Sequence, residues 1–426
     1  MGYPLKKQSS TTSEVELEAH PNVSSKKKYL ALGLLSFSSG LPVPLLSATL
    51  QAWLVSESIS LVQIGLLSAV TLPYGLRFLW APFVDRYYFP KIGARRSWLV
   101  FSQVGLIISL GVLAHLNPKD NLNLFFAIAL VVGLLGATQD TAADALRAEV
   151  LTEKERGPGS SVSVIGSRLA FFVSGAVALI LADHFSWKAI YLFMAGLVSI
   201  GITGSLISPN PQSHQLSTEN LRDSIRKPFL EFFERKDALF ITATIVLYKV
   251  GFSMANSMSV PFFLSQGFTK TDIGSINKVL GLVFTLAGAS AGGLMIKRFG
   301  SLKTLFGFGW LQLSASLVFA MVALFPKSLF NLVICVSFDN FCGGLATAAL
   351  FAFILSKAEK SFIATQMGIM GSLLALTRTI SSMPTGWIVE QWGWACFFIV
   401  TAILGVPALL LLKRVTPKVA IPLDRA

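Results

Sequence analysis

Charged residues are scarce in this chain. Only 13% of its 426 residues are Asp, Glu, Lys or Arg, whereas a soluble protein carries about 25%. Hydrophobic residues make up 53%, and the mean hydropathy is +0.65. This composition excludes an ordinary soluble domain and indicates a protein whose helices are surrounded by lipid.

Cysteine and histidine are also rare. The three cysteines, Cys335, Cys342 and Cys396, lie in apolar runs and have neither the spacing of a disulfide framework nor that of metal ligands. The four histidines are scattered, and no phosphate-binding loop or nucleophile motif is present. We therefore expect a protein that is not an enzyme and that needs neither a metal ion nor a cofactor.

Hydrophobic runs long enough for a helix to cross a bilayer recur twelve times. They cover residues 29–55, 61–84, 97–116, 122–147, 161–183, 188–207, 238–263, 272–296, 304–325, 328–356, 362–390 and 394–412. The predicted fold is an all-α integral membrane protein with twelve transmembrane helices in two six-helix repeats. The expected units are a disordered cytoplasmic tail (1–28), an N-terminal six-helix bundle (29–207), a cytoplasmic linker (208–237), a C-terminal six-helix bundle (238–412) and a second cytoplasmic tail (413–426).

The loops between these spans differ in their content of Lys and Arg. With the N-terminus placed in the cytoplasm, 25 of the 35 cations lie in cytoplasmic loops and tails, and 4 lie on the other side. Cytoplasmic loops of membrane proteins are enriched in these residues, so the distribution predicts that both termini are cytoplasmic. It also explains the net charge of +13 without a nucleic-acid partner; the expected surroundings are a lipid bilayer.

The two halves resemble each other where spans five and eleven end. An acid, an aromatic residue, a small residue and a tryptophan recur with the same offsets in Asp183–Trp187 and in Glu390–Trp394. Two parallel repeats of six helices are typical of the major facilitator superfamily, in which the substrate binds between the halves near the middle of the membrane.

The loop between spans two and three resembles the signature of that superfamily. It contains Asp85 and Arg86, followed by a glycine and the pair Arg95 and Arg96. In such a loop the carboxylate can cap a helix N-terminus while the arginines pair with carboxylates, which would close a cytoplasmic gate. The alternative is a loop that is merely positively charged on the inner side.

Nine charged residues lie inside the predicted spans, where each costs roughly 2.5–3.5 kcal/mol at the centre of a helix. Charges at this depth mark a solute pathway, a gate or a proton relay, and together they point to a transporter. Six cations against three carboxylates favour an anionic substrate. The nine are Arg77, Arg147, Arg168, Lys249, Lys278 and Arg378, with Asp140, Asp144 and Asp339.

Asp140, Asp144 and Arg147 share one face of span four, because they are spaced i, i+4 and i+7; Gln139 flanks them. Their spacing fits a structural ion cluster as well as a role in substrate binding or proton transfer, and both interpretations stay open. Asp339 is the only carboxylate near the predicted middle of the second half.

Four of the nine charges lie in the second half. Lys249 and Asp339 fall near the middle of spans seven and ten, which line the cavity in this superfamily, and Lys278 and Arg378 fall on spans eight and eleven, which flank it. We expect these residues to serve the substrate or proton pathway; the alternative for them is a purely structural buried pair. Asp339 facing Lys249 could bind and release the proton of a symporter.

Longer strings in both halves resemble the AmpG muropeptide permeases, over about residues 29–412. The resemblance implies proton-driven import of GlcNAc-anhydro-MurNAc peptides from periplasm to cytoplasm across the bacterial inner membrane, by alternating access, for cell-wall recycling; we expect a monomer. Phe252 departs from the family pattern, which suggests an acid there. The alternatives are a transporter of another anion, such as a CoA ester or a peptide, and a membrane scaffold without transport. The matching strings are Ser39–Pro42, Thr49–Trp53, Arg77–Pro82, Gln139–Ala145, Val246–Lys249, Asn277–Leu282, Cys342–Ala349 and Lys360–Gln366.

Overall fold

The computed structural model describes residues 24–87, 89, 92–152, 155–209, 238–357 and 363–415. The regular structure within these ranges is helical. Almost all of the predicted linker, residues 210–237, and most of the two predicted tails lie outside the described residues.

The N-terminal half contains six membrane-crossing segments, and prolines divide the first two of them. Pro42 and Pro44 lack the N–H that continues a helix, so the first segment consists of three short helices. Pro73 and Pro82 mark similar breaks in the second. The helical segments are α1 (Ser25–Gly40), α2 (Pro42–Leu45), α3 (Ala48–Ser56), α4 (Leu61–Leu67), η1 (Ser68–Thr71), α5 (Leu72–Leu76), η2 (Arg77–Leu79), α6 (Ala81–Arg86), α7 (Ala94–His115), α8 (Leu122–Val150), α9 (Arg156–Phe171), η3 (Phe172–Val177), α10 (Ala178–Leu181) and α11 (Trp187–Ile207).

The C-terminal half repeats this order with fewer breaks. Its helical segments are α13 (Ala238–Ser257), α14 (Ser259–Ser265), α15 (Lys270–Asp272), η4 (Ile273–Leu280), α16 (Gly281–Phe299), α17 (Ser301–Val322), α18 (Leu329–Lys357), α19 (Ile363–Ser382) and α20 (Thr385–Val415). Gly393 has φ 74° and ψ 171°, so α20 is two helices that meet at this residue. The first continues α19, and the second is the last membrane-crossing helix.

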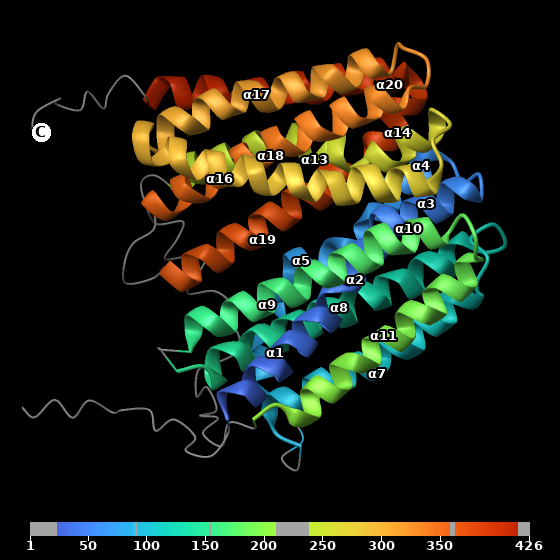
Figure 1. Cartoon of the computed structure of the whole chain (residues 1–426), viewed down its shortest axis with the longest axis vertical. Helices are drawn as coiled ribbons and strands as arrows, with labels where there is room; N and C mark the ends of the chain where they lie inside the picture. Colours follow the sequence, from blue (N-terminus) through green and yellow to red (C-terminus); the bar gives the residue numbers. More distant parts are fainter. Residues whose placement is uncertain are drawn as a thin grey trace, which may run out of the picture.

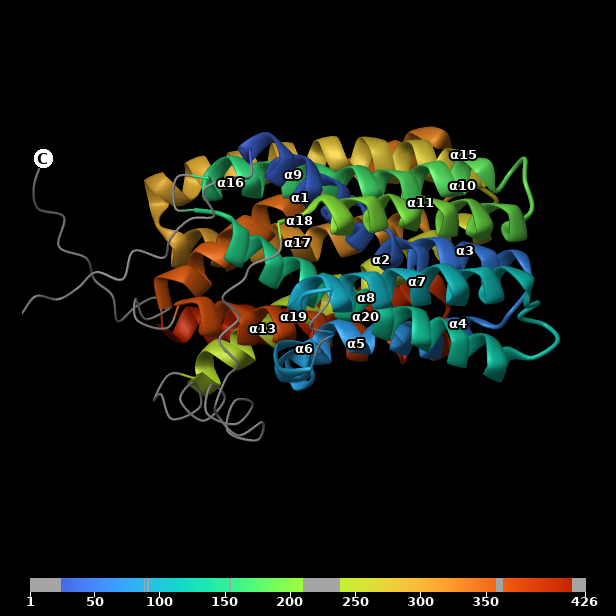
Figure 2. The ribbon, with the colours of Figure 1, turned by 90° about the horizontal axis from the view of Figure 1, so that it is seen from below.

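Eleven helical stretches of the described chain are long and apolar enough to cross a membrane. The eleventh predicted span, 362–390, accounts for the difference, because its main helix, α19, is not among the eleven, while α20 contains the end of that span and the whole of the twelfth. The long helices run along one common direction (Figure 2), as helices crossing a single bilayer do. The predicted all-α membrane fold is therefore confirmed, and the count of twelve spans is supported approximately.

The two halves meet at one end of the molecule and separate toward the other (Figure 1). Their principal contacts pair α3 with α14, α4 with α20, α5 with α19, and η3 and α10 with α15 and η4. The largest apolar core joins the halves in this region. We call this end the closed side, and the opposite end, where α1 begins and α20 ends, the open side.

The tryptophans of the repeated sequence occupy equivalent places in the two halves. Trp187, at the start of α11, stacks on Trp53 with ring centroids 5.9 Å apart. Trp394, at the start of the last helix, packs against Phe262 of α14 at 5.3 Å. The repeat in the sequence thus corresponds to a repeated packing of one helix end against the next.

Candidate substrate and proton pathway

The halves enclose a polar cavity near the closed side. It has a volume of about 110 Å³ and lies between α3, α4 and η1 of one half and α13, α14 and α19 of the other. Hydroxyl and amide groups of both halves line it, among them Gln51, Asn256 and Thr379. The hydroxyl oxygens of Thr71 and Thr379 lie 2.9 Å apart across the boundary between the halves. Such a lining can hydrogen-bond a polar solute or water.

Arg378 gives this cavity its positive charge. It lies on α19, lines the cavity and is exposed, although it belongs to a membrane-spanning helix. Among the described residues its guanidinium has no ion-pair partner. The Tyr74 hydroxyl, which is within electrostatic range, has no hydrogen-bond partner there either. A guanidinium that is not neutralised by the protein is a binding group for a carboxylate or phosphate.

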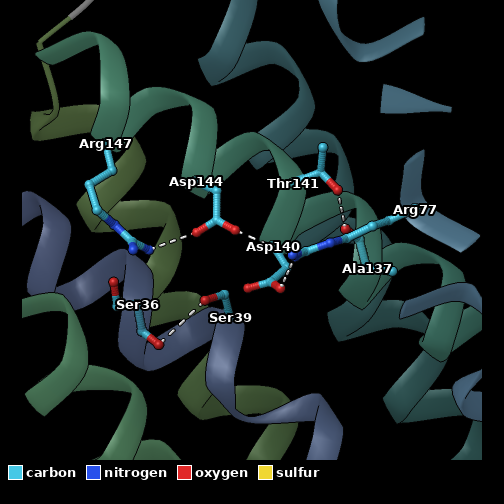
Figure 3. A network of polar contacts seen from close by, with 8 residues as sticks. All are labelled: Ser36, Ser39, Arg77, Ala137, Asp140, Thr141, Asp144 and Arg147. Atoms are coloured by element: carbon cyan, nitrogen blue, oxygen red, sulfur yellow. Dashed lines mark hydrogen bonds and ion pairs between the residues drawn. The ribbon is translucent and has the colours of Figure 1, made fainter. Parts of the chain in front are cut away.

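A second group of charges lies on α8 and at the start of η2 (Figure 3). Arg77 Nη1 lies 2.9 Å from Asp140 Oδ2 and 3.4 Å from Asp144 Oδ2. Arg147 Nη2 lies 2.9 Å from Asp144 Oδ1. The side chains of Arg77, Asp140 and Asp144 are 35%, 32% and 44% exposed, so this network borders open space. The predicted face of Asp140, Asp144 and Arg147 is therefore present, and Arg77 from span two completes it.

Gln139 does not join this network, although it precedes Asp140. Its side chain is buried, and its Nε2 donates to Ser38 Oγ of α1 at 2.9 Å. Ser38 Oγ in turn donates to the Val198 carbonyl of α11 at 3.2 Å. Gln139 thus connects three helices inside the N-terminal half, on the side of α8 away from the charges.

Lys249 and Asp339 lie near each other but form no direct ion pair. Lys249 Nζ donates to Thr347 Oγ1 at 2.9 Å and lies 4.7 Å from the centre of the Phe252 ring. Asp339 is 8% exposed and accepts from Gln312 Nε2 at 3.5 Å. Asp339 thus lies inside the C-terminal half, against α17, and the predicted proton role of Asp339 opposite Lys249 stays a prediction.

The predicted gate loop carries its arginines on the open side. Arg95 pairs with Glu149 of α8 at 2.5 Å, Arg96 donates to the Ser208 carbonyl, and Arg86 is exposed. These contacts join helices within the N-terminal half, so they do not bridge the two halves. The side chains of Asp85 and Lys278 lie outside the described part of the chain.

A carboxylate that the sequence did not single out also lies on the open side. Glu155 precedes α9 and accepts from Ser25 Oγ at 2.7 Å, from Lys28 Nζ at 3.0 Å and from Thr152. The hydrogen bond from Ser25, together with those from Lys28 and Thr152, lowers the pKa of Glu155 to about 2. This cluster fastens the start of α1 to the loop before α9.

Tyr74 and the hydroxyl groups of the cavity were not recognised from the sequence either, because serine, threonine and tyrosine are common in membrane helices and no spacing marks these as a set. In the described ranges, no group of three or more His, Cys, Asp or Glu side chains is placed to hold a metal ion.

The sequence profile of the Major Facilitator Superfamily matches residues 29–382. The chain belongs to the major facilitator superfamily. It is 37% identical over 381 residues to the anhydromuropeptide permease of Escherichia coli (strain K12), covering 89% of this chain and 78% of that protein. It is 29% identical to the putative transporter AmpG 4 of Rickettsia conorii, covering 91% and 96% of the two chains. The resemblance to the AmpG family is thereby confirmed, and the chain is a permease rather than an enzyme.

Solved structures agree on the fold. A POT-family transporter in complex with a thioalcohol-conjugated peptide superimposes with a TM-score of 0.72 at 14% sequence identity, covering 93% of this permease and 96% of that chain. At this identity the likeness concerns the helical architecture alone.

Proposed function

We propose that this permease carries anhydromuropeptides from the periplasm to the cytoplasm across the bacterial inner membrane, together with protons, by alternating access. The name of its relative in Escherichia coli supports the substrate, since the two chains share 37% of their residues over most of their length. The pathway described above lies within one chain, so we propose the monomer as the transporting unit.

The main support for this proposal is the exposure of charged side chains that lie at membrane depth. In a scaffold without transport, charges within the membrane should be paired and dry. Here Arg77, Asp140 and Asp144 are about one-third exposed or more, and Arg378 lies exposed in a polar cavity. Charges that border open space at membrane depth are those of a solute or ion pathway.

Arg378 supports an anionic substrate. Peptide carboxylates of a muropeptide can pair with its guanidinium through two parallel hydrogen bonds. The surrounding hydroxyl and amide groups can hydrogen-bond the sugar and peptide parts of the same molecule. A transporter of another anion, such as a CoA ester, would use the same guanidinium and is distinguished by the assay below.

The direction of transport rests on the distribution of loop cations. The side richer in Lys and Arg is the side where α1 begins and α20 ends, which is the open side. We propose that this side faces the cytoplasm and that the structure is an inward-open state. A fusion of alkaline phosphatase after residue 220 tests this topology: the enzyme should stay inactive, and activity there would contradict it.

For the proton we favour Asp140 and Asp144 over Asp339. A coupling carboxylate must exchange its proton with a water-filled vestibule, and both span-four carboxylates reach open space while Asp339 is 8% exposed. Protonation of Asp140 would weaken its pairing with Arg77 and change the charge that the substrate meets.

Uptake into proteoliposomes tests the proposal. Labelled anhydromuropeptide should accumulate when the lumen is alkaline relative to the outside, and a protonophore should abolish the accumulation. Arg378→Gln should lower uptake at low substrate concentration by about tenfold or more, since one charge-assisted contact is worth roughly 1.5–3 kcal/mol. The matched control is Arg298→Gln, which removes an exposed charge at the end of α16.

Accumulation of a CoA ester or of an unrelated peptide, with no uptake of anhydromuropeptide, would replace the proposed substrate. Equal uptake by Arg378→Gln and Arg298→Gln would remove Arg378 from the binding site. No uptake of any of these anions by the folded protein would support the scaffold.

A further inference from the structure

Two carboxylates reach across the boundary between the halves on the closed side. Glu390, near the end of span eleven, accepts from the backbone N–H of Val62 in α4, with Oε1 3.0 Å from the nitrogen. Asp183, at the end of span five, accepts from the backbone N–H and the hydroxyl of Thr271 in α15, both at 2.7 Å from Oδ2. Each half therefore supplies a carboxylate to the first turn of a helix in the other half.

The two contacts occupy the same position in their helices. In each, the foreign carboxylate bonds the second N–H of the helix, and the helix's own cap bonds the third. Ser60 Oγ accepts from the N–H of Gln63 at 3.3 Å, and Thr269 Oγ1 accepts from the N–H of Asp272 at 3.0 Å. First-turn N–H groups have no partner within the helix, so both acceptors satisfy donors that the fold leaves free.

A glycine follows three residues after each bonded N–H, Gly65 in α4 and Gly274 in η4, which continues α15, and it allows the close approach. A Cβ atom on Gly65 would lie 2.7 Å from the Met383 carbonyl oxygen, and one on Gly274 would lie 2.8 Å from the Ala176 carbonyl oxygen. Each of these carbonyls belongs to the opposite half. Any larger residue at either glycine would push the halves apart.

We propose that Asp183 and Glu390 form a two-part gate on the closed side, related by the internal repeat of the chain. While both carboxylates hold their N–H partners, the halves stay together on this side and the cavity opens only toward the other. When the protein changes to the opposite state, both carboxylates must exchange these N–H groups for water. The gate thus sets the balance between the two states of the transport cycle.

One side of the gate has a further contact. Lys270, the first residue of α15, donates from Nζ to the Ala182 carbonyl at 3.0 Å and lies 5.2 Å from the centre of the Trp187 ring. The equivalent position in α4 is Leu61, which carries no such group. The Asp183 contact is therefore the stronger part, and we expect Asp183→Asn to have a larger effect than Glu390→Gln.

Single-molecule fluorescence energy transfer in nanodiscs measures the balance directly. Dyes at Asp120→Cys and Pro326→Cys report the distance between the halves on the closed side, and dyes at Lys26→Cys and Lys303→Cys report it on the open side. Cys396, the exposed native cysteine, is replaced by serine in every variant. No substrate is needed, so failure of this proposal is distinguishable from failure of the proposed substrate.

Asp183→Asn should raise the ratio of molecules open on the closed side by about five- to tenfold and Glu390→Gln by about two- to fivefold; the variant with both changes should show about the product, roughly 10- to 50-fold, since the two contacts share no residue. The matched control is Asp272→Asn. It removes the same charge next to the gate, one residue after Thr271, but its carboxylate accepts from the N–H of Thr269 within its own half at 3.0 Å. The control should leave the ratio unchanged.

Glycine substitutions give a second measurement. Gly274→Ala should increase the closed-side distance, whereas Gly196→Ala, in open space on α11, should not. If the double carboxylate variant populates the state open on the closed side no more than Asp272→Asn does, the carboxylates are not a gate. The proposal is also refuted if Gly274→Ala shows the same closed-side distance as the unmodified protein.

Discussion

The pair of Arg77 and Asp140 decides whether the charges of span four are structural or take part in coupling. The perturbation is a double-mutant cycle with Arg77→Gln, Asp140→Asn and both together. Asn resembles the protonated carboxyl in shape and charge, and Gln removes the guanidinium that two carboxylates share. The cycle therefore separates the pairing of the two residues from the need for a carboxyl group that can lose a proton.

The geometry sets the expected magnitude. At the 2.9 Å between Arg77 Nη1 and Asp140 Oδ2, Coulomb attraction is on the order of 1 kcal/mol in bulk water and on the order of 6 kcal/mol at an effective dielectric constant of about 20. Exposed pairs contribute roughly 0.2–1 kcal/mol, and breaking a dry pair costs roughly 3–5 kcal/mol. For side chains about one-third exposed, we expect Arg77→Gln to destabilise the protein by about 1–2 kcal/mol.

The four proteins of the cycle are compared by thermal unfolding and by two transport assays, exchange of substrate and accumulation driven by the proton gradient. Arg77→Gln leaves Asp140 and Asp144 with only Arg147 to compensate them, so it should lower the unfolding midpoint. The double variant should regain most of this loss. Asp140→Asn and the double variant should both keep exchange of substrate across the membrane but lose accumulation driven by the proton gradient.

Either of two results would refute this reasoning. If the double variant accumulates substrate at the normal rate, Asp140 serves only to neutralise Arg77, and the cluster is structural. If the coupling energy of the cycle is zero within about 0.3–0.5 kcal/mol, the two residues act independently and the ion pair contributes nothing to the fold.

Three further predictions concern other charged sites. Glu155 should stabilise the protein above pH 4.5, by about 1–2 kcal/mol when solvent screening at this surface site is allowed for, because its pKa is lowered on folding. This contribution should be lost as the pH falls from about 4.5 to about 2, so the difference in unfolding midpoint between the unmodified chain and Glu155→Gln should shrink toward zero over that range. Asp339→Asn should keep gradient-driven accumulation of substrate. If this variant loses accumulation but still exchanges substrate across the membrane, Asp339 is the coupling carboxylate. Phe252→Leu should destabilise the protein by about 0.5–2 kcal/mol in thermal unfolding, since it removes the ring beneath the ammonium of Lys249, whereas Phe252→Tyr should be neutral.

Hydropathy predicted where the chain crosses the membrane, because each span must satisfy its own backbone hydrogen bonds and therefore appears as one long apolar run. It could not predict which way a polar side chain turns. Gln139 and Asp140 are neighbours in the sequence, yet Gln139 bonds Ser38 inside the half while Asp140 borders open space. The direction of each side chain depends on helices more than 60 residues away in the sequence, and a local sequence pattern carries no information about them.

The same limit applies to Asp339. Its depth in span ten followed from the sequence, but its contact with Gln312 depends on how α17 packs against α18. The internal repeat was more informative, since Asp183 and Glu390 were matched by their offsets from the tryptophans that follow. What the offsets could not show is that both carboxylates bond the opposite half, because that contact exists only when the halves are brought together.

The glycines at the boundary between the halves also determine what kind of motion is possible. At Gly65 all the nearest atoms of the opposite half are main-chain atoms, and at Gly274 the nearest is the main-chain oxygen of Ala176, so turning a side chain aside would not be enough to let the solute pass. Backbone atoms of a helix cannot move separately from the helix that carries them. Opening must therefore displace whole helices at once, and the passage should switch in an all-or-none manner, with no partly open, leaking intermediate of appreciable lifetime.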